Sequence, residues 1–271
     1  MKYYTDMAFE RFNCYFKADE NYKLNNNIEK VVVEIDSNDK ARYFCKPFGR
    51  YVCLNVCSNY NSKKYETITN ELSSELKSFL MKEKSSSILI IGLGNENVVC
   101  DTLGVLACKK VISGNVGERK VYSFCPSVEG ITGIDSSILI SNLIKQTKCD
   151  TVIIIDSFYS INIKRLGKSF QISNGGMKLN NNELTKKKLG VPVIVVGCPF
   201  AIKMESVINS VLDNLCENKR KYKINLDCLK GNENVVTLLN VNNEIANAAR
   251  IISSAINMAI HNLEFEDVFT L

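Results

Sequence analysis

Two aspartates stand at the ends of short apolar segments that are typical of buried strands. Ser87–Ile91 runs into the turn Gly92-Leu93-Gly94-Asn95, and Asp101 follows this turn at the start of a predicted helix. Thr151–Ile155 runs directly into Asp156. Open parallel sheets bind ligands at the carboxyl ends of their strands, so we expect both carboxylates at one crevice. Two carboxylates in a partly desolvated site cannot both ionise easily, and the resulting acid and base could activate water.

Simpler structural roles are the alternatives for these residues. Asp101 could cap a helix N-terminus, and Asp156 could belong to a turn that ends its strand. The Gly-Leu-Gly turn also has the first two glycines of a dinucleotide-binding GxGxxG motif. Asn97 replaces the third glycine of that motif. The motif also needs an acidic residue at the end of the next strand, and residues 111–120 contain only Glu118. A tight turn of small residues beside a site explains this segment better, and nucleotide or phosphate binding stays as an alternative.

A second loop, Glu129–Asp135, precedes a predicted helix and could present backbone N–H groups to a carbonyl or an anion. A plain loop with Asp135 as the helix cap is the alternative. The single histidine, His261, falls on the apolar pattern of the C-terminal helix, which favours a packed side chain over a catalytic one. One histidine excludes multi-His metal centres and directs any catalysis to carboxylates. We therefore expect neither a metal ion nor a cofactor.

Strand-like and helical segments alternate through most of the chain. The expected strands are Ser87–Ile91, Val121–Cys125, Thr151–Ile155 and Val193–Val196, and the expected helices are Tyr65–Lys84, Asp101–Ile112, Ser136–Gln146, Ile202–Cys216 and Asn243–Asn262. This pattern predicts an α/β fold with a mostly parallel central sheet flanked by helices. Residues 7–60 predict a β-rich N-terminal appendage, with β-branched and aromatic residues in Lys30–Asp36 and Tyr43–Val56. Lys178–Lys188 is predicted to be a surface loop.

Composition sets the expected compartment and partners. The net charge of +5 is too small to indicate a nucleic-acid partner. The 11 cysteines are scattered and odd in number, and no CxxC pair occurs, which favours reduced thiols over a disulfide framework. The N-terminus lacks the apolar stretch of a signal peptide, and no apolar run approaches the roughly 20 residues that span a bilayer. We expect a cytoplasmic protein with no membrane contact.

An ordered series of short motifs resembles the germination (spore) proteases, which degrade small acid-soluble spore proteins when endospores germinate. Each motif is short, and their order along most of the chain is what carries the resemblance. The motifs are Thr5-Asp6-Met7-Ala8-Phe9-Glu10, Gly49-Arg50-Tyr51, Gly92-Leu93-Gly94-Asn95, Asp101-x-Leu103-Gly104, Thr132-Gly133-Ile134-Asp135, Ile155-Asp156, Leu189-Gly190-Val191-Pro192 and Ala259-Ile260-His261.

The resemblance implies an atypical aspartic-type endopeptidase whose essential pair falls on Asp101 and Asp156. It implies a phosphorylase/hydrolase-like α/β fold, as in hydrogenase maturation proteases, and a tetramer in the forespore or spore core. Family members are made as zymogens, and the processed bond would join Asp6 and Met7. Residues 1–6 would then be a propeptide and residues 7–271 a single protease domain.

In this hypothesis, the backbone around Gly94 and Asn95, or around Thr132 and Gly133, lines the site and polarises the scissile carbonyl. Small acid-soluble spore proteins are the expected substrates.

The sequence also departs from the family pattern. Asn174 replaces an aspartate, the loop at residues 177–188 is shortened, Cys100 replaces the proline before Asp101, and the arginine after the second aspartate is lost. These changes motivate a second hypothesis, a catalytically weak or inactive paralogue that binds spore proteins or protease subunits.

Overall fold

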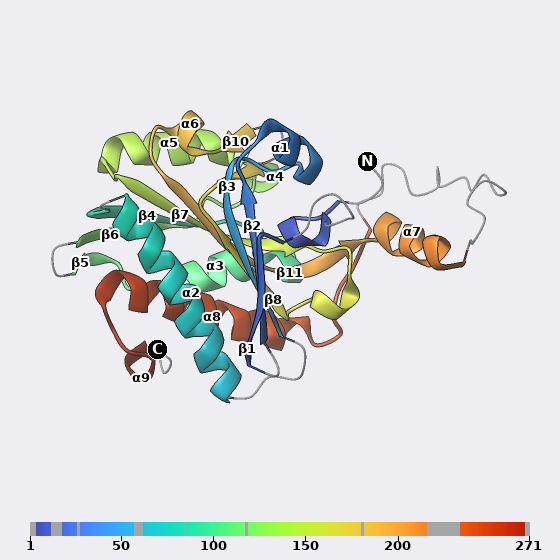
Figure 1. Cartoon of the computed structure of the whole chain (residues 1–271). Coiled ribbons are helices and arrows are strands. Elements are labelled where there is room, and N and C mark those ends of the chain that lie inside the picture. The colour runs from blue at the N-terminus through green and yellow to red at the C-terminus, as the bar shows by residue number, and fades with distance from the viewer. Residues whose placement is uncertain are drawn as a thin grey trace.

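The computed structural model describes residues 4–11, 18–25, 28–56, 62–83, 85–116, 119–179, 182–215 and 234–268. Within these residues, one 10-stranded sheet with helices on both faces dominates the architecture (Figure 1). The strand order is β1-β2-β3-β8-β11-β7-β4-β6-β5, and β12 pairs with β11. The strands are β1 (Glu20–Asn25), β2 (Ile28–Ile35), β3 (Gly49–Val56), β4 (Ser87–Gly92), β5 (Gly114–Val116), β6 (Arg119–Phe124), β7 (Thr151–Tyr159), β8 (Ser169–Ser173), β11 (Val193–Lys203) and β12 (Val235–Val236).

The four central strands β11, β7, β4 and β6 run parallel, and the pairings outside them are antiparallel. The predicted α/β class is confirmed, and the sheet is mixed, with its parallel part confined to this centre. Strands β7 and β11 consist of nearly uninterrupted apolar residues because helices cover both faces of the sheet.

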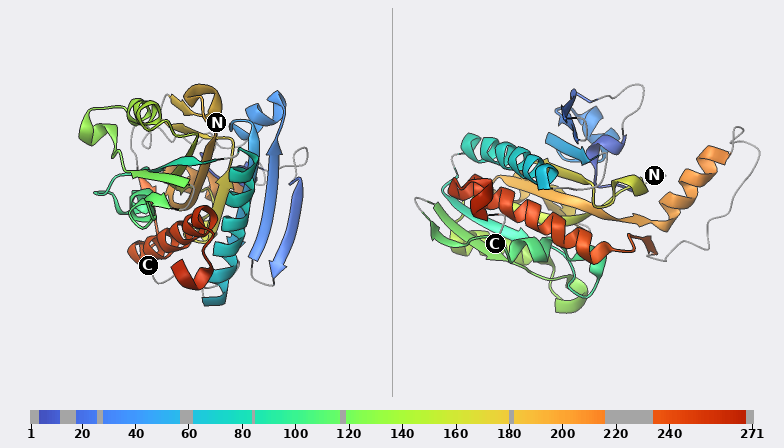
Figure 2. Two further views of the ribbon diagram at one scale, coloured as in Figure 1. Left: turned by 90° about the vertical axis from the view of Figure 1, so that its left-hand side faces the viewer. Right: turned by 90° about the horizontal axis from the view of Figure 1, so that it is seen from below.

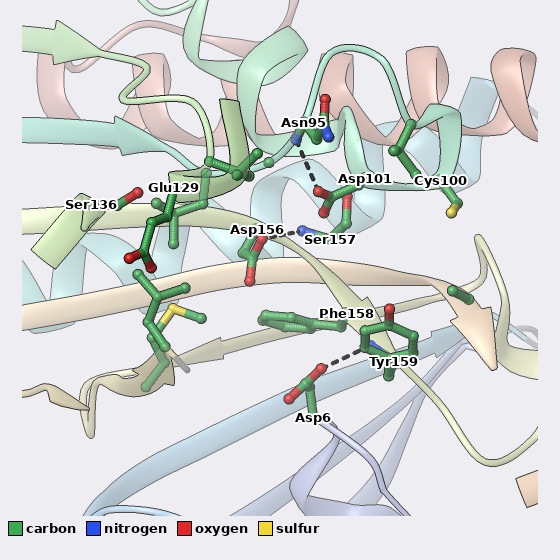
Figure 3. Close-up of a pocket in the computed structure, with 18 of the residues that line it drawn as sticks. Asp6, Asn95, Cys100, Asp101, Glu129, Ser136, Asp156, Ser157, Phe158 and Tyr159 are labelled. Carbon is green, nitrogen blue, oxygen red and sulfur yellow. Dashed lines mark hydrogen bonds between the residues drawn. The ribbon is translucent and has the colours of Figure 1, made fainter. Parts of the chain in front are cut away.

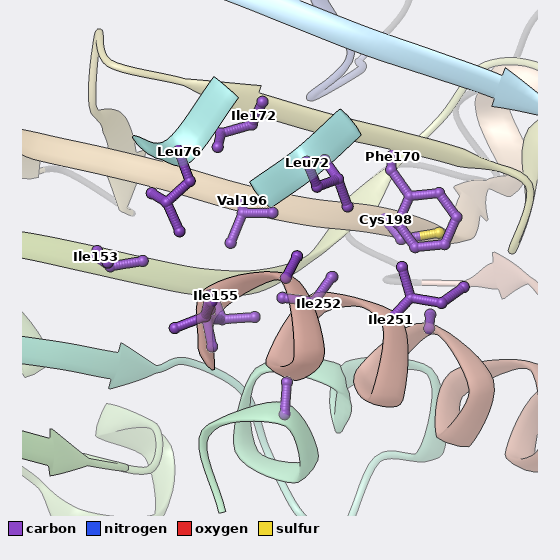
Figure 4. Close-up of a cluster of buried hydrophobic side chains, with 14 of the residues drawn as sticks. Leu72, Leu76, Ile153, Ile155, Phe170, Ile172, Val196, Cys198, Ile251 and Ile252 are labelled. Carbon is purple, nitrogen blue, oxygen red and sulfur yellow. The ribbon is translucent and has the colours of Figure 1, made fainter. Parts of the chain in front are cut away.

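Helices α2 (Ser62–Lys82), α3 (Leu103–Cys108) and α8 (Val241–His261) cover one face, and α2 and α8 lie side by side on it (Figure 2). Side chains that point to this face from the strands, such as Ile153 and Ile155, join Leu72 of α2 and Ile252 of α8 in one apolar cluster (Figure 4). The alternate strand residues form a second cluster under α5 (Ser136–Thr147) on the opposite face. Successive residues of a strand face opposite sides of the sheet, so each strand contributes to both clusters, and the sheet packs against helices on both faces.

The N-terminal strands continue the main sheet. β3 pairs with β8 from Tyr51 opposite Ser173 to Asn55 opposite Ser169, so β1, β2 and β3 extend the edge of the sheet. A short helix, α1 (Asn38–Phe44), overlaps the start of the expected strand Tyr43–Val56, and β3 begins only at Gly49. The Ser37 hydroxyl caps α1 by accepting a hydrogen bond from the Lys40 N–H, a local signal that favours the helix there.

The segment expected to be a surface loop at Lys178–Lys188 is ordered instead, in the part that the structure describes. Strands β9 (Met177–Leu179) and β10 (Asn182–Leu184) form an antiparallel hairpin, and α6 (Lys186–Leu189) follows. Leu184 is fully buried. The loop prediction is wrong here because it followed the Asn- and Lys-rich composition and missed this one apolar anchor.

The remaining α-helices are α4 (Glu129–Thr132), α7 (Met204–Leu215) and α9 (Phe265–Val268), and short 3-10 helices span Ala8–Arg11, Val99–Asp101 and Ile163–Arg165. Among the described residues, we find no helix with the length and hydrophobicity that a membrane span requires.

Candidate active site

Two glycines let the segment after β4 lie against the end of β7. Gly94 has a φ of +129°, and a β-carbon added there would collide with the backbone oxygen of Asp101. A β-carbon on Gly104 would collide with the backbone oxygens of Leu93 and Ile155. Because neither glycine has a side chain, the 3-10 turn Val99–Asp101 and helix α3 approach both strand ends closely.

Asp101 holds the turn that precedes it. Its Oδ2 accepts a hydrogen bond from the Asn95 N–H at 2.9 Å. Thr102, and not Asp101, is the N-cap residue of α3, so the helix-cap alternative is wrong for Asp101. Burial raises the pKa of the Asp101 carboxyl to about 6, and the Asn95 hydrogen bond opposes part of that rise.

Asp156 lies inside β7, which extends beyond the end of the neighbouring strand β4. β4 ends at Gly92, opposite Ile155, whereas β7 continues to Tyr159 along β11, so the alternative of a strand-ending turn is wrong. The Asp156 Oδ1 accepts a hydrogen bond from the Ser157 N–H at 2.9 Å. Burial raises the pKa of Asp156 well above its usual range, and the negative charges of Asp101 and Asp6 add to the rise.

Both carboxyl groups line one cavity of about 810 Å³, in which they lie close together (Figure 3). Each aspartate uses one oxygen for a backbone N–H. Among the described residues, the other oxygen of each accepts no hydrogen bond. Gly94, Asn95 and the loop from Ser127 to Gly130 complete this part of the wall. The cavity therefore presents two carboxyl oxygens whose protons are held more tightly than those of exposed aspartates.

Asp6 also lines this cavity, as do Glu129 and Asp135, and the strand-end spacing in the sequence does not point to it. Its backbone N–H donates to the Tyr159 oxygen at 2.9 Å, and its Oδ2 accepts from the Tyr159 N–H at 2.9 Å. The Tyr4 hydroxyl donates to its Oδ1 at 3.2 Å, and the Lys46 ammonium lies 3.8 Å from the same oxygen. Asp6 is distant in sequence from both strand ends, and only the resemblance singled it out, for processing.

The peptide bond between Asp6 and Met7 lies inside the fold. The Gln171 side-chain amide donates to the Asp6 oxygen at 2.9 Å, and the Met7 N–H donates to the Thr5 hydroxyl at 3.0 Å. The Met7 side chain is fully buried.

A second acidic residue, Glu10, anchors this N-terminal segment. Its carboxylate accepts hydrogen bonds from the Thr5 hydroxyl, from the Ser160 hydroxyl at 2.5 Å and from the Ile161 N–H at 3.0 Å. Arg165 lies 3.5 Å away. Through these hydrogen bonds, Thr5, Asp6 and Glu10 attach the N-terminal segment to the end of β7 and to the loop after it.

Of the other residues singled out from sequence, Thr132 and Gly133 lie outside the cavity wall, whereas Asp135 is part of it. Thr132 ends α4 and Gly133 caps it with a φ of +69°; both are exposed, and neither lines the cavity. Asp135 does cap α5, through the Ser137 N–H at 2.7 Å. His261 lies at the end of α8, 3.0 Å from the Ile112 oxygen, and burial lowers its pKa.

Asn174, which replaces an acidic residue of the family pattern, has a structural role. Its side-chain oxygen accepts the Arg50 N–H at 2.8 Å. Among the described residues, no cluster of three or more His, Cys, Asp or Glu side chains is arranged to hold a metal ion.

Two aspartate side chains thus lie in one cavity at the C-terminal ends of parallel strands, and a backbone N–H group holds each of them. This arrangement defines an α/β protein in which paired carboxyl groups could serve as acid and base. The germination protease family model, Peptidase_A25, matches residues 13–222. The chain belongs to the germination protease family, which confirms the resemblance of its motifs.

The similar proteins agree with this assignment. A germination protease of Clostridium perfringens (strain SM101) is 26% identical over 97% of this chain and 97% of its own length. One of Clostridium acetobutylicum is 29% identical over 82% of this chain and 77% of its own. One of Bacillus subtilis (strain 168) is 32% identical over 64% of this chain and 53% of its own. Family membership supports a protease role in spore germination.

Among solved structures, a NiFe hydrogenase maturation protease, HycI, from Thermococcus kodakarensis KOD1 is similar with a TM-score of 0.39 and 14% identity. The match covers 67% of this chain and 98% of that one.

Proposed function

We propose that this protein is an endopeptidase that cleaves small acid-soluble spore proteins during spore germination, with Asp101 and Asp156 as the catalytic pair. The observation that carries the proposal is the convergence of these two carboxyls in one cavity, where burial raises the pKa of both. Two neighbouring carboxyls with separated pKa values can supply a base and an acid to one reaction.

We assign a role to each aspartate from its environment. The Asn95 N–H favours the charged form of Asp101, whose pKa of about 6 leaves it ionised at neutral pH. Asp156 lies deeper, and its burial and the charges of Asp101 and Asp6 raise its pKa well above its usual range, which favours it as the carboxyl that holds the proton. Asp101 is therefore the base and Asp156 the acid.

Peptide hydrolysis then needs one water molecule and one proton transfer at each carboxyl. Asp101 removes a proton from water as the oxygen adds to the scissile carbonyl carbon, and the proton of Asp156 hydrogen-bonds the carbonyl oxygen. As the carbon–nitrogen bond breaks, Asp156 gives that proton to the departing amine. The proton on Asp101 then passes to Asp156, directly or through a water molecule, which restores the starting protonation of the pair. The Asn95 N–H is already bound to Asp101, so the Gly94–Asn95 turn acts by positioning the base.

The resemblance also bears on processing and assembly. Removal of residues 1–6 by cleavage between Asp6 and Met7 would take the Asp6 carboxylate out of the cavity. That bond is enclosed by its hydrogen bonds, so the segment must leave its place before it is cut. We place the protein in the cytoplasm of the forespore and spore core, as a tetramer that needs no metal ion or cofactor.

Digestion of a purified small acid-soluble spore protein, followed by mass spectrometry of the fragments and of the N-terminus of the enzyme, tests the proposal. We expect cleavage at a few defined bonds by the wild type, and a loss of about 10³-fold or more in Asp101→Asn and Asp156→Asn, since each removes a proton-transfer group. Asp39→Asn is a matched control, because Asp39 is exposed on α1. A rate near wild type in either site variant would contradict the pair. Binding without cleavage would identify the inactive paralogue.

A further inference from the structure

Two cysteines meet next to the proposed site. Cys108 is the last residue of α3, the helix that follows Asp101, and its side chain is only 2% exposed. Cys125 follows the end of β6, is half-buried, and begins the loop that carries Ser127, Val128 and Glu129 into the cavity wall. The Cys108 Sγ lies 3.7 Å from the backbone oxygen of Phe124, the residue that precedes Cys125, so the two thiols are neighbours. Both are free, and no other role in the site uses them.

Backbone contacts hold the two sulfur atoms in this place. The Cys108 Sγ lies 3.8 Å from the Ile90 oxygen and 3.7 Å from the Phe124 oxygen, so it sits against both β4 and β6. The close approach depends on Gly92, where an added β-carbon would come within 2.6 Å of the Cys108 β-carbon. The pair is thus fixed by the sheet and not by flexible segments.

The two thiols differ in reactivity. The neighbouring Cys108 thiol and the charge of Lys109 lower the pKa of Cys125, against the effect of its burial. The Cys125 thiol and burial raise the pKa of Cys108. A thiol with a lowered pKa and partial exposure reacts first with an oxidant, and a neighbouring thiol then resolves the product.

We propose that Cys108 and Cys125 form a reversible disulfide under peroxide, and that this modification switches off the adjacent site. The Cys125 thiolate attacks hydrogen peroxide, which yields a sulfenic acid at Cys125 and hydroxide. The Cys108 thiol then displaces the sulfenic oxygen, which leaves as water while the S–S bond forms. Peroxide is reduced by two electrons, and the two thiols are oxidised to one disulfide.

The new bond changes the geometry of the cavity wall. The S–S bond of a disulfide is about 2.05 Å long, shorter than the distance between two sulfur atoms that are not bonded, so α3 and the segment after Cys125 are drawn together. Ser127 holds a left-handed backbone with a φ of +62°, and its oxygen accepts from the Ser136 hydroxyl at 3.1 Å, so this loop has little freedom to absorb the shift. The displacement passes to the wall beside Asp101 and Asp156. The inhibitory effect rests on the proposed function, whereas the disulfide itself does not.

Peptide mapping tests the disulfide without reference to activity. The reduced full-length protein is treated with hydrogen peroxide, its remaining thiols are alkylated, and the digest is searched for crosslinked peptides. We expect a Cys108–Cys125 crosslink that dithiothreitol removes. Cys125→Ser should abolish it, and Cys45→Ser, at another half-buried cysteine, should leave it unchanged. Absence of this crosslink in the folded wild type, or crosslinking mainly of other cysteines, would overturn the proposal.

Cleavage assays on the same samples test the effect on the site. We expect oxidation to lower the cleavage rate by about 100-fold, the loss associated with a displacement of about 1 Å in a catalytic site. Dithiothreitol should restore the rate, and Cys125→Ser should keep its rate after peroxide. A crosslinked protein that cleaves at the unoxidised rate would refute the switch while leaving the disulfide and the proposed function intact.

Discussion

Asp6 and Tyr159 exchange two hydrogen bonds of 2.9 Å: the Asp6 N–H donates to the Tyr159 oxygen, and the Tyr159 N–H donates to the Asp6 carboxylate. They join the start of the chain to the end of β7, the strand that carries Asp156. The proposed acid therefore titrates under the influence of a charge from the N-terminal segment as well as that of Asp101.

Asp6→Asn should lower the pKa of Asp156, because it removes one of the negative charges that disfavour ionisation. Since Asp156 must be protonated to act as the acid, the alkaline limb of the pH–rate profile should move to lower pH. The profile of cleavage by the full-length variant measures this shift, with Asp39→Asn as the control. A limb that stays in place, or moves to higher pH, would contradict the coupling.

Asp101→Asn should stabilise the protein at neutral pH while it abolishes cleavage. The folded-state pKa of about 6 lies above the unfolded value, so the contribution of Asp101 to stability is present below pH 4 and is lost as pH rises through 6. The asparagine of the variant does not titrate, so its free energy of unfolding does not fall in this way as the pH rises. Because Asp101 is partly exposed, we expect a gain of about 1–2 kcal/mol at pH 7 and none near pH 3. Urea unfolding of the variant and the wild type at both pH values measures this gain. An equal difference in unfolding free energy at the two pH values would rule out titration of Asp101 as its cause.

Gly104→Ala should damage both the fold and the site. The added methyl group meets two backbone oxygens, at Leu93 and Ile155, which cannot move without shifting β4 or β7. Overpacking of this kind costs about 1–3 kcal/mol. Gly130→Ala is the stability control, because an added β-carbon there meets no atom within 4 Å. Equal unfolding free energies for the two variants would show that the close approach of α3 is not required.

Glu10→Gln should release the N-terminal segment. The buried carboxylate accepts from three groups and lies beside Arg165, and the amide cannot replace both of its oxygens as acceptors. We expect a loss of about 1–3 kcal/mol. Amide hydrogen exchange at Asp6 and Met7 should become faster, whereas Glu66→Gln, on an exposed position of α2, should not change it. Unaltered exchange in Glu10→Gln would mean that other contacts suffice to hold the segment.

The parallel centre of the sheet and its two aspartates could be predicted from the sequence, because they depend on local signals. The uninterrupted apolar residues before Gly-Leu-Gly and before Asp156 predict buried parallel strands. Their ends predicted that Asp101 and Asp156 lie at one crevice, and both residues do line one cavity. Asp6 could not be placed in this way. Its position depends on pairing with Tyr159, a contact between the two ends of a long stretch of chain that no periodicity encodes.

Strand ends were also harder to predict than strand centres. β7 was expected to stop at Ile155, yet it continues to Tyr159 because β11 extends beside it. The hairpin of β9 and β10 depends on the packing of Leu184, which the polar composition around it conceals.

β4 ends at Gly92 whereas β7 continues to Tyr159, so the last residues on this edge of β7 pair with no strand in the part of the chain that the structure describes. This decides the shape of the polypeptide that the cavity can accept. Past Gly92, the backbone of β7 faces the cavity, and the Asp6 N–H already pairs with it at Tyr159. A polypeptide that replaces this segment would bind by strand addition, through main-chain hydrogen bonds, and must be extended over several residues. Discrimination would then depend on the local conformation of the substrate as well as on its side chains. A peptide crosslinked into a helix should resist cleavage that its linear form undergoes, and equal cleavage of both forms would exclude strand addition.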